Sequence, residues 1–344
     1  MTAKTGIIVL LTVLTVLSGY SAPANPKEER IKYGERRELM GTYAQIDTCL
    51  TDENEARARA AYRPVWARLE DIAWRMNVFD KNSEVTRINQ SYPNPVEVQA
   101  DTYGVIKAAA YYNKLSKGAF DITVWPLIKL WKKSEKEQRL PGFEEIRQVQ
   151  ESLGPDNIAL LENNQIVLKH PETRIDLGGI GAGYALDEAA KIFRANGVND
   201  FFIDIGGDIY AGGKNCEEKP WRIGIRNPEE ESEIIDIVAL SDMAVTTSGD
   251  YEKFYEINGR RWSHIINPVT GYPQKGVVSA TVIAPTGIDA DALATAVCVM
   301  GRPAGTEMIN SLGENFASLI LEPGVNGQFI REENQIYKRF PIDK

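Results

Sequence analysis

Histidine and cysteine are both scarce in this chain, which removes most soft-metal and redox centres from consideration. There are two histidines and three cysteines among 344 residues. Cys49, Cys216 and Cys298 are widely spaced and match no metal-binding or redox motif. One disulfide can be drawn among them, but no pattern selects a pair, so small buried cysteines are the favoured interpretation.

The sequence also has no cluster of basic residues. Its formal net charge is −9, and the Lys and Arg residues are scattered. Because a nucleic-acid backbone is bound by a concentrated positive surface, nucleic acid is excluded as a partner. The content of 43% hydrophobic and 25% charged residues is typical of a folded globular protein.

The longest apolar run lies at the N-terminus and is too short for a membrane span, which needs about 20 apolar residues. Lys4 precedes the apolar residues 6–17, and small residues follow, which is the order of a secretory signal. We predict a signal segment over residues 1–24 and export to the periplasm or the outer face of the cytoplasmic membrane. Tyr20 stands where lipid attachment would need a cysteine, so acylation is not expected; a buried N-terminal helix is the alternative.

Residues 25–38 are rich in Lys, Glu and Arg and are interpreted as a flexible lead-in to a folded domain over residues 39–344. Strand and helix patterns follow one another without steady alternation, which favours one mixed domain of the α+β class. Residue 101 is the expected N-cap of the second helix. Helices are predicted over residues 53–76, 101–115, 184–196 and 289–300, and strands over residues 39–46, 157–161, 165–168, 174–177, 201–205, 221–226, 234–240, 243–246, 254–257 and 277–284.

Closely spaced glycines join a predicted strand to a helix in residues 176–184, DLGGIGAGY. Exposed amides and a helix N-terminus can approach a phosphate there. The spacing is not the G-x-G-x-x-G of dinucleotide-binding folds. A tight turn in a packed core is the alternative.

Asp291 and Thr295 lie four residues apart on a predicted helix and therefore share one face. A carboxylate and a hydroxyl are hard oxygen ligands of the kind that Mg²⁺ uses together with water and phosphate. The alternative is an acidic first turn on an Ala-rich helix, with Asp289 as its cap.

His264 lies between hydroxyl and amide side chains in SHIINPVTG, just before a Pro and Gly turn. A histidine near neutral pH can position or accept a proton from an attacking hydroxyl. An ordinary hydrogen-bonded histidine is the alternative. The acidic turns at residues 118–123, 205–208 and 246–250 are further candidates, although each can be only a turn.

Taken in order, these motifs resemble the ApbE family of FAD:protein FMN transferases. The resemblance extends from about Met40 to near the C-terminus. It rests on MGT at residues 40–42, DKNSE leading to RIN at 80–89, GAFDITVWPL, IDLGGIGAGYALD, FIDIGGDIYAGG, AVTTSGDYEKF, SHIINPVTGYP and DADALATAVCVMG.

The resemblance implies a single ApbE-type domain whose two lobes enclose a cleft for FAD. It implies that Met40 and Phe79 flank the flavin and adenine parts, and that Mg²⁺ is held by Asp291, Thr295 and a backbone carbonyl, for which we choose Gly179. Members commonly have Lys or Glu in place of Ala182, and many have aspartate in place of Asn267. The further nucleotide contacts that it implies are Ala119, Phe120, Asp121, Asp176, Ala182 and Ile265.

The implied reaction places the FMN half of FAD on a Ser or Thr hydroxyl of an acceptor protein and releases AMP. His264 is the candidate for orienting or deprotonating that hydroxyl, and Asp250 is a candidate for supporting the site. The implied acceptors are exported or membrane-bound redox subunits with a short Ser/Thr motif, which leaves an inner-membrane association of the enzyme open. Two alternatives remain, namely an FAD pyrophosphatase that makes FMN and AMP, and a flavin-binding carrier without activity.

Overall fold

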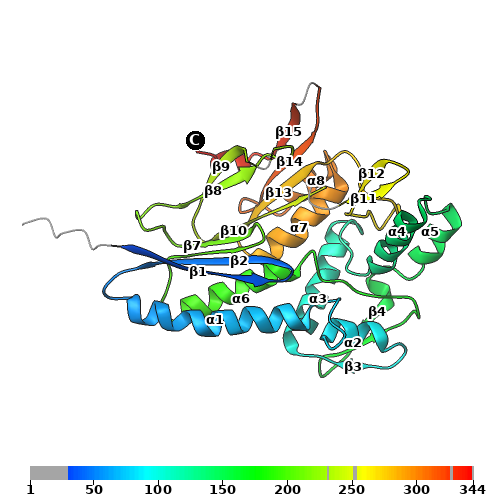
Figure 1. Ribbon diagram of the computed structural model, residues 1–344, viewed down its shortest axis with the longest axis horizontal. Coiled ribbons are helices and arrows are strands. Elements are labelled where there is room, and N and C mark those ends of the chain that lie inside the picture. Colours follow the sequence, from blue (N-terminus) through cyan, green and yellow to red (C-terminus); the bar gives the residue numbers. More distant parts are fainter. Residues whose placement is uncertain (1–29, 231, 251–253, 326–327, 343–344) are drawn as a thin grey trace, which may run out of the picture.

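An eight-stranded antiparallel sheet organises the molecule (Figure 1). The computed structural model describes residues 30–230, 232–250, 254–325 and 328–342, so the predicted signal segment lies outside the described residues. Within the described part, no helix is both long and apolar enough to cross a membrane. The strands run in the order β1 (Ile31–Leu39), β2 (Thr42–Leu50), β6 (Phe201–Ile205), β7 (Asp208–Gly212), β10 (Met243–Gly249), β13 (Ser279–Ala284), β14 (Ala317–Pro323) and β15 (Phe329–Glu333).

The two faces of this sheet are covered by different layers. Successive side chains of a strand point to opposite faces; accordingly, Val282 belongs to the main core and Ile283 to a second core. The main core is formed with helices α1 (Glu55–Arg75), α6 (Gly181–Ala195) and α7 (Gly287–Met300). The second core is closed by the hairpin of β8 (Trp221–Arg226) and β9 (Ile234–Leu240), on the opposite side of the sheet in Figure 1.

A smaller lobe lies beyond one end of the helical layer (Figure 1). Its own core is built around Trp131 of α4 (Trp125–Glu137), with Ile146 of α5 (Phe143–Gln150) and Trp262 of the hairpin of β11 (Phe254–Ile257) and β12 (Arg260–Ser263). The segment that begins with His264 follows β12 directly. The remaining elements are α2 (Glu84–Gln90), β3 (Val96–Glu97), α3 (Ala100–Leu115), β4 (Ile158–Leu160), β5 (Gln165–Leu168), α8 (Ala304–Asn310) and 3₁₀ turns at Pro155–Asn157 and Tyr337–Arg339.

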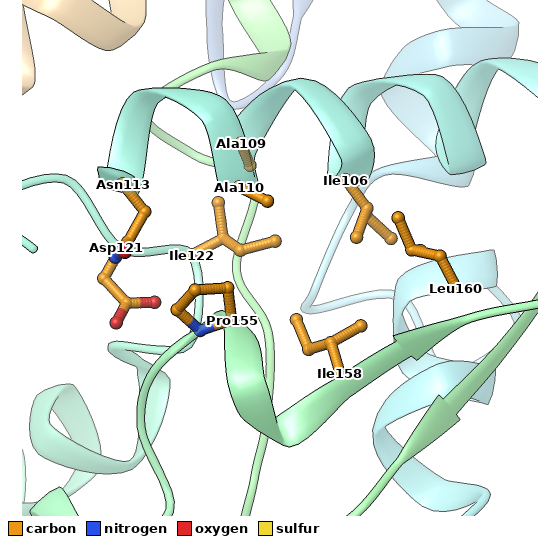
Figure 2. A pocket seen from close by; sticks show the side chains of 9 residues that line it. All are labelled: Ile106, Ala109, Ala110, Asn113, Asp121, Ile122, Pro155, Ile158 and Leu160. Atoms are coloured by element: carbon orange, nitrogen blue, oxygen red, sulfur yellow. The ribbon is translucent and has the colours of Figure 1, made fainter. Parts of the chain in front are cut away.

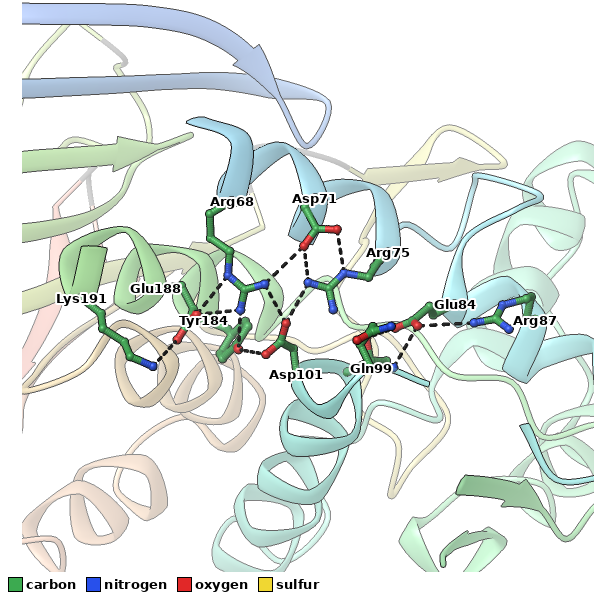
Figure 3. A network of polar contacts seen from close by, with 11 residues as sticks. Arg68, Asp71, Arg75, Glu84, Arg87, Gln99, Asp101, Tyr184, Glu188 and Lys191 are labelled. Carbon is green, nitrogen blue, oxygen red and sulfur yellow. Dashed lines mark hydrogen bonds and ion pairs between the residues drawn. The ribbon is translucent and has the colours of Figure 1, made fainter. Parts of the chain in front are cut away.

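A polar network joins helices α1, α3 and α6 (Figure 3). Asp101 accepts from Arg68 at 2.7 Å, Arg75 at 2.8 Å and Tyr184 at 2.9 Å, and Arg68 also contacts Glu188 at 2.6 Å. The hydrogen bond from Arg68 holds the pKa of Asp101 well below its usual range. Asp101 therefore ties α1 and α6 to α3, and its predicted role as an N-cap is wrong, because Gln99 occupies the N-cap position.

Two of the predicted backbone assignments are wrong. Residues 31–38 are not a flexible lead-in, because β1 pairs with β2 over its whole length from Ile31 to Leu39. Charged side chains are common on edge strands, where they discourage pairing with other chains, and this composition made the strand look like a solvated segment. Residues 174–177 are not a strand; they form no ladder and lead directly into the glycine turn.

The preference for unpaired cysteines is also wrong for two of the three. Cys49 and Cys216 form a disulfide with a Cα–Cα distance of 5.2 Å. Cys298 is free and buried in α7. The pair lies 167 residues apart in sequence, and only the pairing of β2 with β6 brings the β2 cysteine toward the segment after β7.

Candidate functional site

Helices α6 and α7 cross with their backbones almost in contact. A Cβ atom built on Gly183 would overlap the carbonyl oxygen of Gly287, and one built on Gly287 would overlap the carbonyl oxygen of Gly183. Only residues without a side chain permit this approach. The crossing brings the first turns of both helices, and the segments before them, to one place.

Asp291 points across this crossing. The Gly183 N–H donates to Asp291 Oδ2 at 2.9 Å, and the Asp291 side chain is buried. No ion pair among the described residues includes Asp291, and burial raises the pKa of its carboxyl group. Among the described residues, Asp291 Oδ1 has no hydrogen-bond partner, so this oxygen is available to a cation. A bound cation would favour the ionised form of the carboxyl group.

Thr295 lies one turn after Asp291 and faces the glycine turn. A Cβ built on Gly179 would lie 3.1 Å from Thr295 Oγ1, and Ser248 Oγ of β10 lies 3.3 Å from the same oxygen. Asp291, Thr295 and Gly179, the three predicted metal ligands, are therefore brought together. In the described part of the chain no group of three or more His, Cys, Asp or Glu side chains is arranged to hold a metal. A single carboxylate with hydroxyl and carbonyl oxygens fits Mg²⁺, which takes few protein ligands, better than Zn²⁺.

The predicted nucleotide contacts around Phe120 adjoin the glycine turn. Phe120 Cε2 would lie 3.5 Å from a Cβ on Gly179, and the Asp176 N–H donates to the Ile122 carbonyl at 2.7 Å. Ala119 and Phe120 are buried. Burial also raises the pKa of Asp121, whose Oδ1 accepts from the Thr123 hydroxyl at 2.6 Å.

Asp121 lies at one end of a small hollow beneath α3 (Figure 2). The hollow has a volume of about 40 Å³ and is otherwise lined mainly by apolar side chains, including Ile106, Ile158 and Leu160. A bound water needs roughly 10–15 Å³ of such space, so the hollow admits a few waters and no nucleotide. Any contact of Asp121 with a nucleotide must therefore be made outside this hollow.

The other predicted cofactor contacts are more dispersed. Met40, in the β1–β2 turn, Ala182 and Ile265 are each half-buried and pack against the main core. Phe79 is 75% exposed, with its ring edge-on to Trp125 at a centroid distance of 5.4 Å. The hydrogen bonds and ring contacts of the described residues do not connect Phe79 with Asp291 or Thr295. The Lys132 ammonium lies over the same ring, 5.5 Å from its centroid, so Phe79 is an exposed aromatic side chain with a cation beside it.

His264 follows β12 and begins a turn that the smaller lobe fixes in place. The Trp131 indole N–H donates to the Gly271 carbonyl at 2.9 Å, and Asn267 Oδ1 accepts from the Val269 N–H at 2.9 Å. A Cβ on Gly118 would lie 3.3 Å from Val269, so the turn lies against the segment that carries Phe120. Asn267 supplies the acceptor that the turn requires, and an aspartate would supply the same oxygen.

Asp250 lies two residues after Ser248, at the end of β10. Its N–H donates to the Val278 carbonyl at 3.1 Å. Burial raises the pKa of Asp250, and the charge of Arg261 on β12 opposes this effect. Asp250 thus lies between the strand that reaches Thr295 and the hairpin that leads to His264.

Gly183 and Ser248 lie within predicted candidate segments, but their individual contacts were not predicted, and Asp187 was not predicted as a site residue. Gly183 and Asp187 lie four residues apart, as do Gly287 and Asp291, and this repeated Gly-x-x-x-Asp spacing is the signal that could have marked them.

Comparison with known proteins identifies the family of this chain. The sequence model of the ApbE family matches residues 40–320. The chain belongs to the ApbE family. Two relatives are both named FAD:protein FMN transferase. The one from Haemophilus influenzae is 31% identical, over 96% of this chain and 98% of the relative. The one from Vibrio cholerae is 36% identical, over 87% of this chain and 88% of the relative.

Solved ApbE structures have the same fold. The ApbE protein from Thermotoga maritima superimposes with a TM-score of 0.81 and 32% identity, covering 91% of this chain and 100% of that one. The flavin transferase ApbE from Vibrio cholerae gives a TM-score of 0.79 and 29% identity, covering 90% and 99%. The prediction of a mixed α+β domain of the ApbE type is confirmed.

The close crossing in this ApbE fold predicts opposite effects of alanine at two helical glycines. Gly183→Ala should lower the free energy of unfolding by roughly 1–3 kcal/mol or more, because the new methyl group also meets Asp291 Cβ, at 2.7 Å. Gly104→Ala, at an exposed position in the second turn of α3 where an added Cβ meets nothing within 4 Å, should raise it by about 0.5–1 kcal/mol. Urea unfolding of both variants measures the two free energies of unfolding. Equal changes at the two positions would contradict the close crossing.

Proposed function

We propose that this protein is a Mg²⁺-dependent FAD:protein FMN transferase that attaches FMN to a Ser or Thr of an exported acceptor. The supporting observation is the meeting of Asp291, Thr295 and Gly179 beside the glycine turn of an ApbE fold. Mg²⁺ bound there would neutralise negative charge on the pyrophosphate of FAD.

The reaction is an exchange at one phosphorus. The acceptor hydroxyl oxygen forms a bond to the FMN phosphorus, the bond from that phosphorus to the bridging oxygen breaks, and AMP leaves with the electron pair. The hydroxyl proton passes to a base. His264 is the candidate base because its turn is held by Trp131 and Asn267 next to the segment that carries Phe120.

The nucleotide contacts have a positioning role in this proposal. Phe120 and Asp176 adjoin the glycine turn, which leads into the N-terminus of α6, and a helix N-terminus favours a phosphate. The exposed ring of Phe79 offers a stacking surface for an aromatic base or for the flavin. Met40, Ala182 and Ile265 supply apolar contacts at the margin of the core.

Export is part of the proposal. The Cys49–Cys216 disulfide favours an oxidising compartment, in agreement with a signal segment over residues 1–24. We expect protein isolated from a periplasmic extract and denatured without reductant to show one titratable thiol, that of Cys298. Three thiols would argue against the disulfide and against this compartment.

The transferase is tested by mass spectrometry of an acceptor domain incubated with the protein, FAD and Mg²⁺. We expect the acceptor to gain the mass of FMN and AMP to form in equal amount. Asp291→Ala should lower both by about 10³-fold, because the lost carboxylate stabilises developing charge. Circular dichroism checks that the variant is folded, because the Gly183 N–H loses its acceptor. An acceptor in which the target Ser or Thr residue is replaced by Ala serves as the matched control.

The same assay separates the alternatives. Free FMN with AMP and no adduct would favour an FAD pyrophosphatase, and intact FAD would favour a carrier. Full activity of Asp291→Ala would remove the proposed metal site.

A second experiment tests His264. His264→Ala should slow transfer at saturating FAD by roughly 10²–10⁴-fold, the usual contribution of a general base, and leave FAD affinity nearly unchanged. Flavin fluorescence titration and single-turnover kinetics measure the two quantities. Loss of FAD binding with an unchanged transfer step would make His264 a binding residue instead.

A further inference from the structure

Helices α6 and α7 exchange hydrogen bonds in both directions at their crossing. Gly183 of α6 donates to Asp291 of α7, as described above. In the reverse direction the Gly287 N–H donates to Asp187 Oδ1 at 2.6 Å, and the Ile288 N–H donates to Asp187 Oδ2 at 3.0 Å. In each helix the glycine precedes the aspartate by four residues, so both groups lie on the face that meets the other helix.

Asp187 completes the N-terminus of α7. The first amides of a helix have no partner within the helix, and side chains usually satisfy them. Thr286, the N-cap, accepts from the Asp289 N–H at 3.2 Å, which leaves the Gly287 and Ile288 amides to Asp187. The alternative that Asp289 caps α7 is therefore wrong, because Thr286 is the N-cap. Asp289 Oδ1 instead accepts from the Tyr112 hydroxyl of α3 at 2.8 Å.

The position of α7 relative to α6 decides the geometry of the proposed metal site. Gly179 lies just before α6, whereas Asp291 and Thr295 lie on α7. A shift of α7 along α6 would separate these oxygens, and Mg²⁺ requires a near-ideal octahedral arrangement. Asp187 holds the first turn of α7 by two hydrogen bonds, and no hydrogen bond or ion pair among the described residues joins it to the three proposed ligands.

We propose that Asp187 is a positioning residue for the cation site, which holds Asp291 and Thr295 of α7 in register with the Gly179 carbonyl before α6. This inference rests on the proposed function, because it assumes that these three residues bind the metal. Residues that orient metal ligands through hydrogen bonds typically change metal affinity by 10–100-fold when replaced.

Mn²⁺ affinity tests the proposal independently of turnover. Burial raises the pKa of Asp187 to about 6, so titrations at pH 8 keep it ionised. Asp187→Asn keeps one acceptor oxygen and replaces the other with an NH₂ group. This group is a donor and cannot accept the hydrogen bond from the backbone N–H that faces it. We expect the Mn²⁺ Kd of this variant, measured by calorimetry or electron paramagnetic resonance on the folded protein, to rise 10–100-fold.

A matched control separates positioning from general stability. Asp200 also accepts a backbone N–H, from Lys214 at 2.9 Å, and contacts Arg30 at 2.8 Å, and neither contact involves α7. Asp200→Asn should lower the melting temperature and leave the Mn²⁺ Kd unchanged. Excess Mg²⁺ should restore much of the activity of Asp187→Asn and none of that of Asp291→Ala.

The outcomes distinguish the two proposals. A wild-type Mn²⁺ Kd in folded Asp187→Asn overturns the positioning role while leaving the metal site intact. If wild-type protein binds no Mn²⁺, or Asp291→Ala binds it equally well, the metal site of the proposed function fails instead. If Asp187→Asn does not fold, Asp187→Glu, which keeps both oxygens but displaces them by one methylene, takes its place with the same expectation.

Discussion

The close contact between Gly183 and Gly287 is the constraint on which the site depends. Because neither residue has a side chain, α6 and α7 approach until their backbones exchange hydrogen bonds with Asp187 and Asp291. Larger residues would separate the helices, and Asp291 would lose the amide that orients it. The site is thus a property of the helix crossing rather than of a single loop.

The rest of the fold supports this crossing. The large sheet gives α6 and α7 a common base, since both pack on the face that carries Val282. The network around Asp101 fixes α1 and α3 to α6, and Tyr112 of α3 reaches Asp289 at the start of α7. The smaller lobe then brings the turn after His264 against the segment of Phe120. Elements distant in sequence therefore converge on one small region.

Local patterns in the sequence predict what depends on local structure. The alternating or wholly apolar strands β5, β6 and β8 are predicted with their observed bounds, and the spacing of Asp291 and Thr295 correctly places both on one helix face. The strand β1 was missed because its charged side chains face solvent at a sheet edge. The Cys49–Cys216 pair was missed because its partners meet only through the sheet. Asp187 was missed for a similar reason, since its partners are amides of another helix about a hundred residues later.

Anomalous diffraction from crystals soaked in Mn²⁺ tests the central claim most directly, because it locates the cation without reference to activity. We expect a single strong peak within coordination distance of Asp291 Oδ1, Thr295 Oγ1 and the Gly179 carbonyl. A peak elsewhere, or none at this crossing in crystals that contain FAD, would contradict it.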